Sequence, residues 1–269
     1  MAILGRFLVL LGVISLFPNT QRAGSTTGNS ILARPQHESE QSDSYDVLLH
    51  SKSLANQHAA LSEVLDHRQL YVPRIQQSLR DYPRLLQTDP IAARRAVYIS
   101  ALVRDPSFAP ILVKSLGVPI VLDDCEYACP VVFALTIQAC FAGWTPPQGL
   151  DPQLTTVNDL RAEIQMVSRI SLKRRLITDV IQGPGVEKLE KEFGSRSEEQ
   201  IIQMAGPMTS SQETRMNAAF WLETLVTESK NRIDLYLLAL NDFEDGSGEY
   251  KGAVYQAIYR AELAKMRGQ

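Results

Sequence analysis

Two Asp-Pro pairs fix where helices begin and end in the middle of this chain. Asp89-Pro90 is a strong helix start, because Asp caps the first turn and Pro fits the first helical position. Asp105-Pro106 ends that helix and starts the next one, which stops at Gly117. The apolar residues between these marks follow helical spacing and are Ala92, Ala96, Ile99 and Val103, then Phe108, Leu112 and Leu116. We therefore expect two antiparallel helices joined by a tight turn.

A second segment near the other end of the chain has the same organisation. Ser210 followed three residues later by Glu213 fits a capping box. A short break at 228–230 separates two apolar helical faces, and Asn241 stands where a cap is needed. The first face matches the 89–117 segment at a constant offset, with Ala219, Leu222, Leu225 and Val226 opposite Ala96, Ile99, Leu102 and Val103. Both segments predict a helix, a turn, a helix and a cap.

The stretch from Asp89 to Leu102 resembles the first helix of a HEAT-type repeat, with the Asp, Arg and small-residue positions of that family. The resemblance covers two units, 89–117 and 211–241, and it implies stacked antiparallel helix pairs. The same spacing also suits an irregular helical bundle without repeat ancestry. An aromatic content of 7% favours helices over a β-sandwich. The predicted fold class is all-α, either a HEAT-like α-solenoid or an irregular helical bundle.

Helical patterns cover most of the remaining chain. Lys173-Arg174-Arg175 is expected on the solvated face of a long amphipathic helix over 159–181, which Gly183-Pro184-Gly185 ends. The loop over 143–149 is a candidate boundary between two helical lobes. The other expected helices are short ones across 46–65, one over 68–80 that starts near Pro73, an almost wholly apolar one over 129–141, and helices over 187–193, 198–205 and 250–266.

The first 25 residues have the order of a secretory signal peptide. Arg6 precedes an unbroken apolar run over 7–17, and Ala23-Gly24-Ser25 offers a cleavage site. A retained N-terminal anchor is the alternative, although the run is shorter than the ~20 apolar residues of a membrane-spanning helix. Residues 26–45 are predicted to be a disordered linker before a helical-repeat domain over 46–269. We expect an exported protein, periplasmic or extracellular, with no membrane span after signal cleavage.

Cysteine is the first candidate for chemistry. Cys125, Cys129 and Cys140 are the only cysteines, and in an oxidising compartment Cys125 could pair with Cys129 or with Cys140. Cys140 stands in an apolar stretch and is better explained as a buried core thiol. The spacing is not CxxC, so it supports neither a zinc ribbon nor a thioredoxin-like motif. A Cys125–Cys129 disulfide is therefore the candidate that we carry forward.

The remaining polar motifs give little indication of a metal-binding or catalytic site. His50, His58 and His67 are eight and nine residues apart, whereas ligands on one helical turn would be four apart, so we expect surface histidines. Asp123-Asp124 with Glu126 is better explained as a solvated turn than as a carboxylate pair. The acidic segment over 241–249 fails as a calcium loop, because Gly252 stands where the bidentate Glu belongs. We expect no catalytic residues, no metal and no cofactor.

Function is the least constrained property. Stacked helix pairs create concave surfaces that bind other proteins or peptides, so we expect a protein-binding or scaffold module. A structural component of a cell-envelope assembly and an enzyme with dispersed residues are the alternatives. The formal net charge of −3 gives no electrostatic reason to bind nucleic acid. We expect a protein or peptide partner and no nucleic-acid partner.

Overall fold

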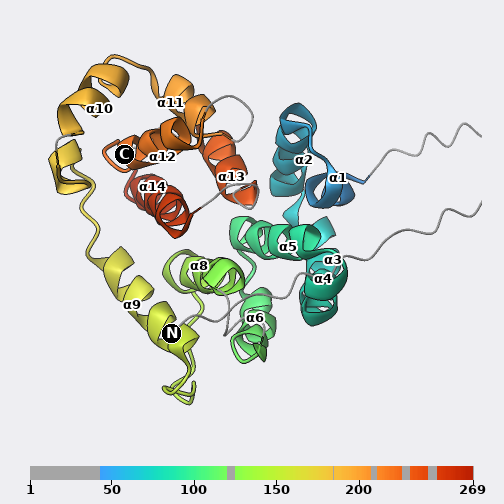
Figure 1. The fold of residues 1–269 in the computed structure, drawn as a ribbon. Helices are drawn as coiled ribbons and strands as arrows, with labels where there is room; N and C mark the ends of the chain where they lie inside the picture. Colours follow the sequence, from blue (N-terminus) through green and yellow to red (C-terminus); the bar gives the residue numbers. More distant parts are fainter. Residues whose placement is uncertain are drawn as a thin grey trace, which may run out of the picture. The chain divides into compact units, whose positions relative to one another are not determined.

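The computed structural model describes residues 43–119, 125–183, 185–206, 211–225, 231–241 and 247–268, and excludes the side chains of residues 125–128. Over these residues the chain is helical and has no strand, which confirms the predicted all-α class (Figure 1). No helix in this part of the chain combines the length and the apolar character needed to cross a membrane. The predicted signal peptide over 1–25 and the predicted linker as far as residue 42 lie outside the described residues.

Thirteen α-helices and two 3₁₀ turns make up the described part of the chain. They are α1 (Ser44–His50), α2 (Leu54–Asp66), α3 (Arg68–Arg80), α4 (Tyr82–Thr88), α5 (Pro90–Val103), η1 (Pro106–Phe108), α6 (Ala109–Ser115), α8 (Cys125–Phe141), α9 (Thr155–Ser168), η2 (Ile177–Asp179), α10 (Val186–Phe193), α11 (Glu198–Ala205), α12 (Gln212–Leu222), α13 (Arg232–Leu240) and α14 (Gly248–Met266). The helices expected over 187–193, 198–205 and 250–266 agree with α10, α11 and α14 to within two residues. Pro73 lies inside α3 instead of near its start.

The start of α5 is set as the sequence predicts. The Asp89 side chain accepts a hydrogen bond of 2.9 Å from the backbone N–H of Ala92, and Pro90 is the first helical residue. The helix ends where Arg104 adopts a left-handed backbone conformation with φ 58°. The turn η1 follows and directs α6 onto α8 and α3, while α5 packs on α8, α3, α4 and α1. The two helices of the expected pair thus bury their apolar faces mainly against other helices.

The second segment behaves in the same way. The Ser211 hydroxyl accepts a hydrogen bond of 3.2 Å from the backbone N–H of Thr214, so the cap of α12 stands one residue after the predicted Ser210. Ala219 and Leu222 are fully buried, as their spacing predicts. The helix α12 packs on α11 and α14, whereas α13 packs on α14, α2 and α5. The two helices of this expected pair therefore also pack mainly on other helices instead of on each other.

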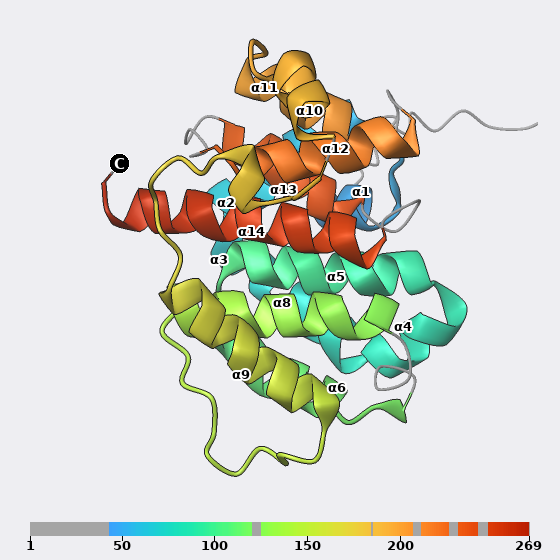
Figure 2. The same ribbon diagram turned by 60° about the vertical axis from the view of Figure 1, so that its left-hand side comes forward.

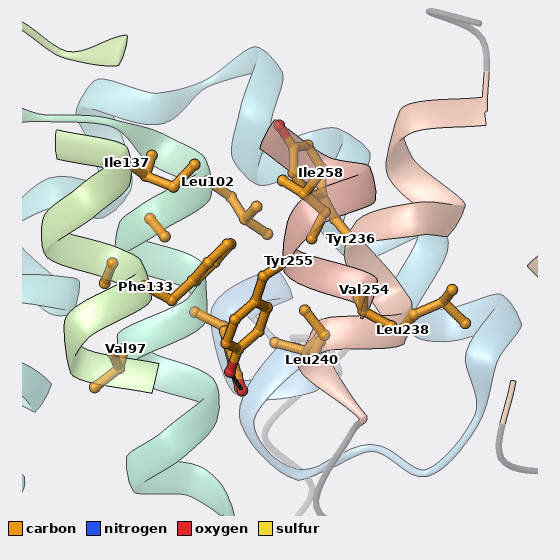
Figure 3. Close-up of a cluster of buried hydrophobic side chains, with 14 of the residues drawn as sticks. Val97, Leu102, Phe133, Ile137, Tyr236, Leu238, Leu240, Val254, Tyr255 and Ile258 are labelled. Atoms are coloured by element: carbon orange, nitrogen blue, oxygen red, sulfur yellow. Dashed lines mark hydrogen bonds between the residues drawn. The ribbon is translucent and has the colours of Figure 1, made fainter. Parts of the chain in front are cut away.

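The helix α8 lies in the core, against α5 on one side and α14 on another (Figure 1). Its Val131, Phe133 and Leu135 are fully buried, as the apolar pattern predicts. The Phe133 ring stacks on Tyr255 of α14 with 4.3 Å between ring centroids. Figure 3 shows these two rings meeting among the apolar side chains of α5, α8, α13 and α14. Aromatic pairs of this kind add about 0.5–1.5 kcal/mol to the stabilisation from area burial.

A buried polar network joins the first described helices to helices distant in sequence. The Arg95 guanidinium donates to the backbone carbonyls of Leu49 and Ser51 at 3.0 and 2.8 Å, and to the Asn241 side-chain oxygen at 2.8 Å. The amides of Asn241 and Gln57 bond to each other at 2.8 and 3.2 Å. Arg95 thereby satisfies carbonyls at the end of α1 that the helix itself leaves unpaired. The network ties α1, α2 and α5 to the end of α13.

The predicted helix over 159–181 is wrong beyond residue 168. The helix α9 ends at Ser168, and the described residues over 169–185 contain no α-helix. Arg260 of α14 donates to the backbone carbonyls of Ser171 and Lys173 at 3.0 and 2.9 Å. These long-range hydrogen bonds take the place of helical ones, so tertiary contacts override the amphipathic pattern. Lys173-Arg174-Arg175 therefore lies on a non-helical segment, which we call the basic segment (residues 169–176).

The loop over 143–149 connects α8 to α9, and Gly143 in it has a positive φ of 76°. The helices on its two sides pack directly against each other. Residues 42–269 form one compact unit. Apolar residues from both sides of this candidate boundary belong to one hydrophobic cluster.

Candidate functional site

An open groove of about 970 Å³ lies beside the basic segment. Its walls come from α9, the chain over 169–179, the residue that follows α12, and α14. Figure 2 shows the chain leaving the end of α9 and passing alongside α14 on its way to α10. The groove, which we call the basic groove, therefore exists because α9 stops early.

Positive charge dominates the lining of the basic groove. The two carboxylates in the lining are Asp179 and Glu223. The five cationic side chains are Arg169, Lys173, Arg174, Arg175 and Arg260. Arg169, Lys173 and Arg174 are exposed, Arg175 is half-buried and Arg260 is 1% exposed. The surface thus presents a local excess of positive charge on a chain whose formal net charge is negative.

Arg260 holds the wall of the groove in place. Besides Ser171 and Lys173, its guanidinium donates to the backbone carbonyl of Leu225 at 3.1 Å. Burial lowers the pKa of Arg260 below its usual value, and the neighbouring Arg175 lowers it further. An arginine remains charged at neutral pH, and it is stabilised here by three carbonyl dipoles. Arg260 is a positioning residue that shapes the groove from beneath.

Glu223 is the acidic counterpart in the groove. Its carboxylate lies 3.3 Å from the Arg175 guanidinium, which also donates to the backbone carbonyl of Asp179 at 2.6 Å. Burial raises the pKa of Glu223 to about 7, even though Arg175 and Arg260 lower it. The charge of the groove therefore changes near neutral pH. Sequence reasoning missed Glu223 and Arg260, because each stands in an ordinary helical pattern far from residue 173.

A second charged cluster lies inside the protein. The buried carboxylate of Glu262 forms ion pairs with Arg104 and Arg232, and both guanidiniums donate to the Tyr236 hydroxyl, at 2.8 and 3.2 Å. The Arg104 guanidinium also lies 5.7 Å from the centre of the Phe141 ring. The cluster joins the end of α5 to α13 and α14. Its opposite charges are paired within the cluster, so we interpret it as a structural connection.

Cys140 does not provide a reactive thiolate at neutral pH. Burial raises the pKa of Cys140 to about 11, and the nearby Glu163 adds to that increase. A thiol with this pKa is protonated at neutral pH and is a weak nucleophile. The side chain of Cys125 lies outside the described residues, so the Cys125–Cys129 disulfide stays a prediction. Cys140 is partly buried and packs against the core, as expected.

His50, His58 and His67 are on the surface, as their spacing predicts. His50 lies 3.5 Å from Asp89, and His58 lies 3.6 Å from Asp234, with every one of these side chains at least 41% exposed. His67 is also exposed. Among the described residues, no group of three or more His, Cys, Asp or Glu side chains could hold a metal ion. The acids at 123, 124 and 126 and most of the 241–249 segment lie outside the described side chains.

Comparison with known proteins identifies no relative of this chain. No family model, no curated protein and no solved structure matches this chain. The basic groove and the chemistry of its lining are therefore the features of this chain that point to a function.

Proposed function

We propose that this chain is an exported helical-repeat protein that binds an acidic segment of a partner protein in the basic groove. The excess of cationic side chains around that groove is the observation that carries the proposal. Arg side chains recognise carboxylates through paired, charge-assisted hydrogen bonds. Export and the HEAT-type ancestry are parts of the proposal that rest on the sequence patterns at 1–25 and 89–117.

The lining favours a peptide over a nucleic acid. Met166 and Ile170 add apolar surface to the lining, and Gln165 offers an amide group to a peptide backbone. The groove lining contains no aromatic side chain, whereas proteins that hold single-stranded nucleic acid commonly stack bases on aromatic rings. The negative formal charge of the whole chain also opposes a long polyanion. A short acidic peptide matches both the positive charge and the limited size of the basic groove.

The test is a titration of the full chain into a fluorescein-labelled oligoglutamate peptide, followed by fluorescence anisotropy. We expect saturable binding that weakens as salt is added, because exposed charges are screened. The double variant Arg169→Gln/Lys173→Gln should bind at least about tenfold more weakly, since each charged hydrogen bond contributes about 1.5–3 kcal/mol. An oligolysine peptide should not bind.

The matched control is Arg84→Gln/Lys188→Gln, which removes the same charge from two exposed sites outside the groove. It should bind oligoglutamate like the wild type. Equal weakening by both double variants would show that only the net charge matters and would contradict the groove assignment. Tighter binding of an oligothymidylate than of oligoglutamate would contradict the choice of a peptide ligand.

A further inference from the structure

A second cavity, of about 390 Å³, lies between α2, α11 and α13. Its apolar lining comes from Leu54, Ala55, Ile202, Leu237 and Leu238. Leu54 is 37% exposed at its edge. We call it the apolar pocket. Apolar surface left in contact with water is unfavourable, and a concave apolar surface of this kind is suited to receive one large aliphatic side chain.

Two carboxylates line the apolar pocket. Glu199 and Asp234 both belong to its lining, and Asp234 is about half exposed beside His58. The lining contains no Lys or Arg. A ligand that fits this chemistry would carry an aliphatic side chain next to a cation.

The basic segment of the same chain presents that combination. Leu176 is 67% exposed and directly precedes η2. Its backbone is extended, with φ −79° and ψ 149°. Arg174, two residues before Leu176, is exposed as well, whereas Arg175 is half-buried. Arg175 pairs with Glu223 at 3.3 Å.

The segment is also fixed before any partner arrives. The backbone N–H of Arg175 donates to the carbonyl of Thr224 at 3.2 Å, and the N–H of Leu176 donates to the Asp179 carboxylate at 3.1 Å. Arg260 holds the carbonyls of Ser171 and Lys173 from beneath. A segment that is already ordered loses little conformational entropy when it docks.

From these two surfaces we infer that the apolar pocket binds Leu176 of a second copy of this chain, with Arg174 of that copy against Asp234 and Glu199. The pocket and the segment share no residue, so the contact joins two different surfaces of the protein. The other large exposed apolar side chains of the described residues fit less well. Leu70 lies within helix α3, and a helix is wider than the non-helical chain around Leu176. Met266 is the last residue of helix α14.

This inference does not rest on the proposed function of the basic groove. Arg174 lines the edge of that groove, so the variant that tests self-association is Leu176→Ser, which leaves the groove lining unchanged. Ala55→Arg tests the pocket, because Ala55 is exposed and a longer cationic side chain there both fills the cavity and opposes Arg174. Both variants should keep the ability to bind oligoglutamate.

The experiment is sedimentation velocity of the full chain over a concentration series. We expect the wild type to self-associate reversibly, and each variant to raise the dissociation constant at least about tenfold, because burying one leucine contributes about 1.5–3 kcal/mol. Leu70→Ser and Ala59→Arg are matched controls at exposed sites outside the pocket, and they should associate like the wild type. All variants should melt at the wild-type temperature.

A mixing experiment makes the assignment specific. The Leu176→Ser variant keeps its pocket, and the Ala55→Arg variant keeps its segment, so an equimolar mixture should form a one-to-one complex although neither associates alone. A wild type that stays monomeric at every concentration would overturn the inference. Self-association that persists in either variant, or a mixture that stays monomeric, would also overturn it.

Discussion

The helix α8 and the chain over 169–185 both lie against α14, but they are held there in different ways. The α8 helix contributes fully buried apolar side chains, and its Phe133 stacks on Tyr255 of α14. Within the 169–185 chain Ile177 is buried in the core, whereas the basic segment before it is attached through directional hydrogen bonds. Arg260 donates two of these bonds, to Ser171 and Lys173, and the backbone N–H of Arg175 donates another to Thr224. The first arrangement gives a core that is insensitive to any single polar group. The second leaves exposed cations free to meet a ligand, at the cost of depending on one buried arginine.

The largest effect should follow from placing a charge in the apolar core. Ala96 of α5 and Leu222 of α12 are both 0% exposed. Ala96→Asp and Leu222→Asp each bury an unpaired carboxylate, and we expect a loss of more than about 4 kcal/mol in the free energy of unfolding. Circular dichroism during heating is the measurement, with exposed Ala59→Asp as the control. A wild-type melting temperature for either core variant would show that the core assignment is wrong.

A smaller and more local effect is expected at Arg260. Arg260→Met keeps the apolar part of the side chain but leaves three backbone carbonyls without their donor. We expect a loss of about 2–3 kcal/mol. The basic segment should also become sensitive to trypsin at Lys173 and Arg174, which limited proteolysis followed by mass spectrometry would detect. Arg267→Met, at the exposed end of α14, is the matched control.

If trypsin cut the Arg260→Met variant no faster than the wild type, the basic segment would be held by something other than Arg260. Cleavage elsewhere at the same increased rate would indicate global unfolding instead of release of the segment. Either result would contradict the view that α8 is held by apolar packing and the basic segment by hydrogen bonds from Arg260.

The same distinction explains what the sequence could and could not predict. The burial of α8 follows from an apolar stretch that admits no exposed face, and the start of α5 follows from the chemistry of Asp89 and Pro90. Both are local properties. The end of α9 is not local, because it depends on Arg260 collecting carbonyl oxygens from a segment about 90 residues earlier in the chain.

The basic groove illustrates the limit most directly. The Lys173-Arg174-Arg175 run is visible in the sequence, and helical periodicity assigned it to a solvated helix face. Nothing in that run indicates that Glu223 lies beside Arg175. The packing of the helices could not be predicted from the sequence for a related reason. The spacing of apolar residues shows which face of a helix is buried, but not which helix that face will contact. Here Arg104 and η1 direct α6 onto α8.

The smallest expected effect concerns the pH dependence of the groove. Burial raises the pKa of Glu223 to about 7 in the folded protein, whereas an unfolded glutamate titrates at about 4.3. Between these values the folded state keeps a proton that the unfolded state has lost. The contribution of Glu223 to stability therefore falls as pH rises from about 4.3 to about 7, by at most ~1.4 kcal/mol per pH unit, and is constant above that range.

Glu223→Gln removes this dependence while it keeps the size and an oxygen acceptor for Arg175. We expect the variant to gain about 1 kcal/mol of stability relative to the wild type between pH 5.5 and pH 7.5, measured by urea unfolding at each pH. The wild type should also bind oligoglutamate more tightly as pH falls through 7, since protonated Glu223 no longer offsets the cations, and the variant should not. A wild type that gains stability relative to the variant as pH rises would mean that the ion pair with Arg175 outweighs burial. The basic segment would then be held by charge pairing as well as by hydrogen bonds. Its attachment would differ even more from the apolar packing of α8.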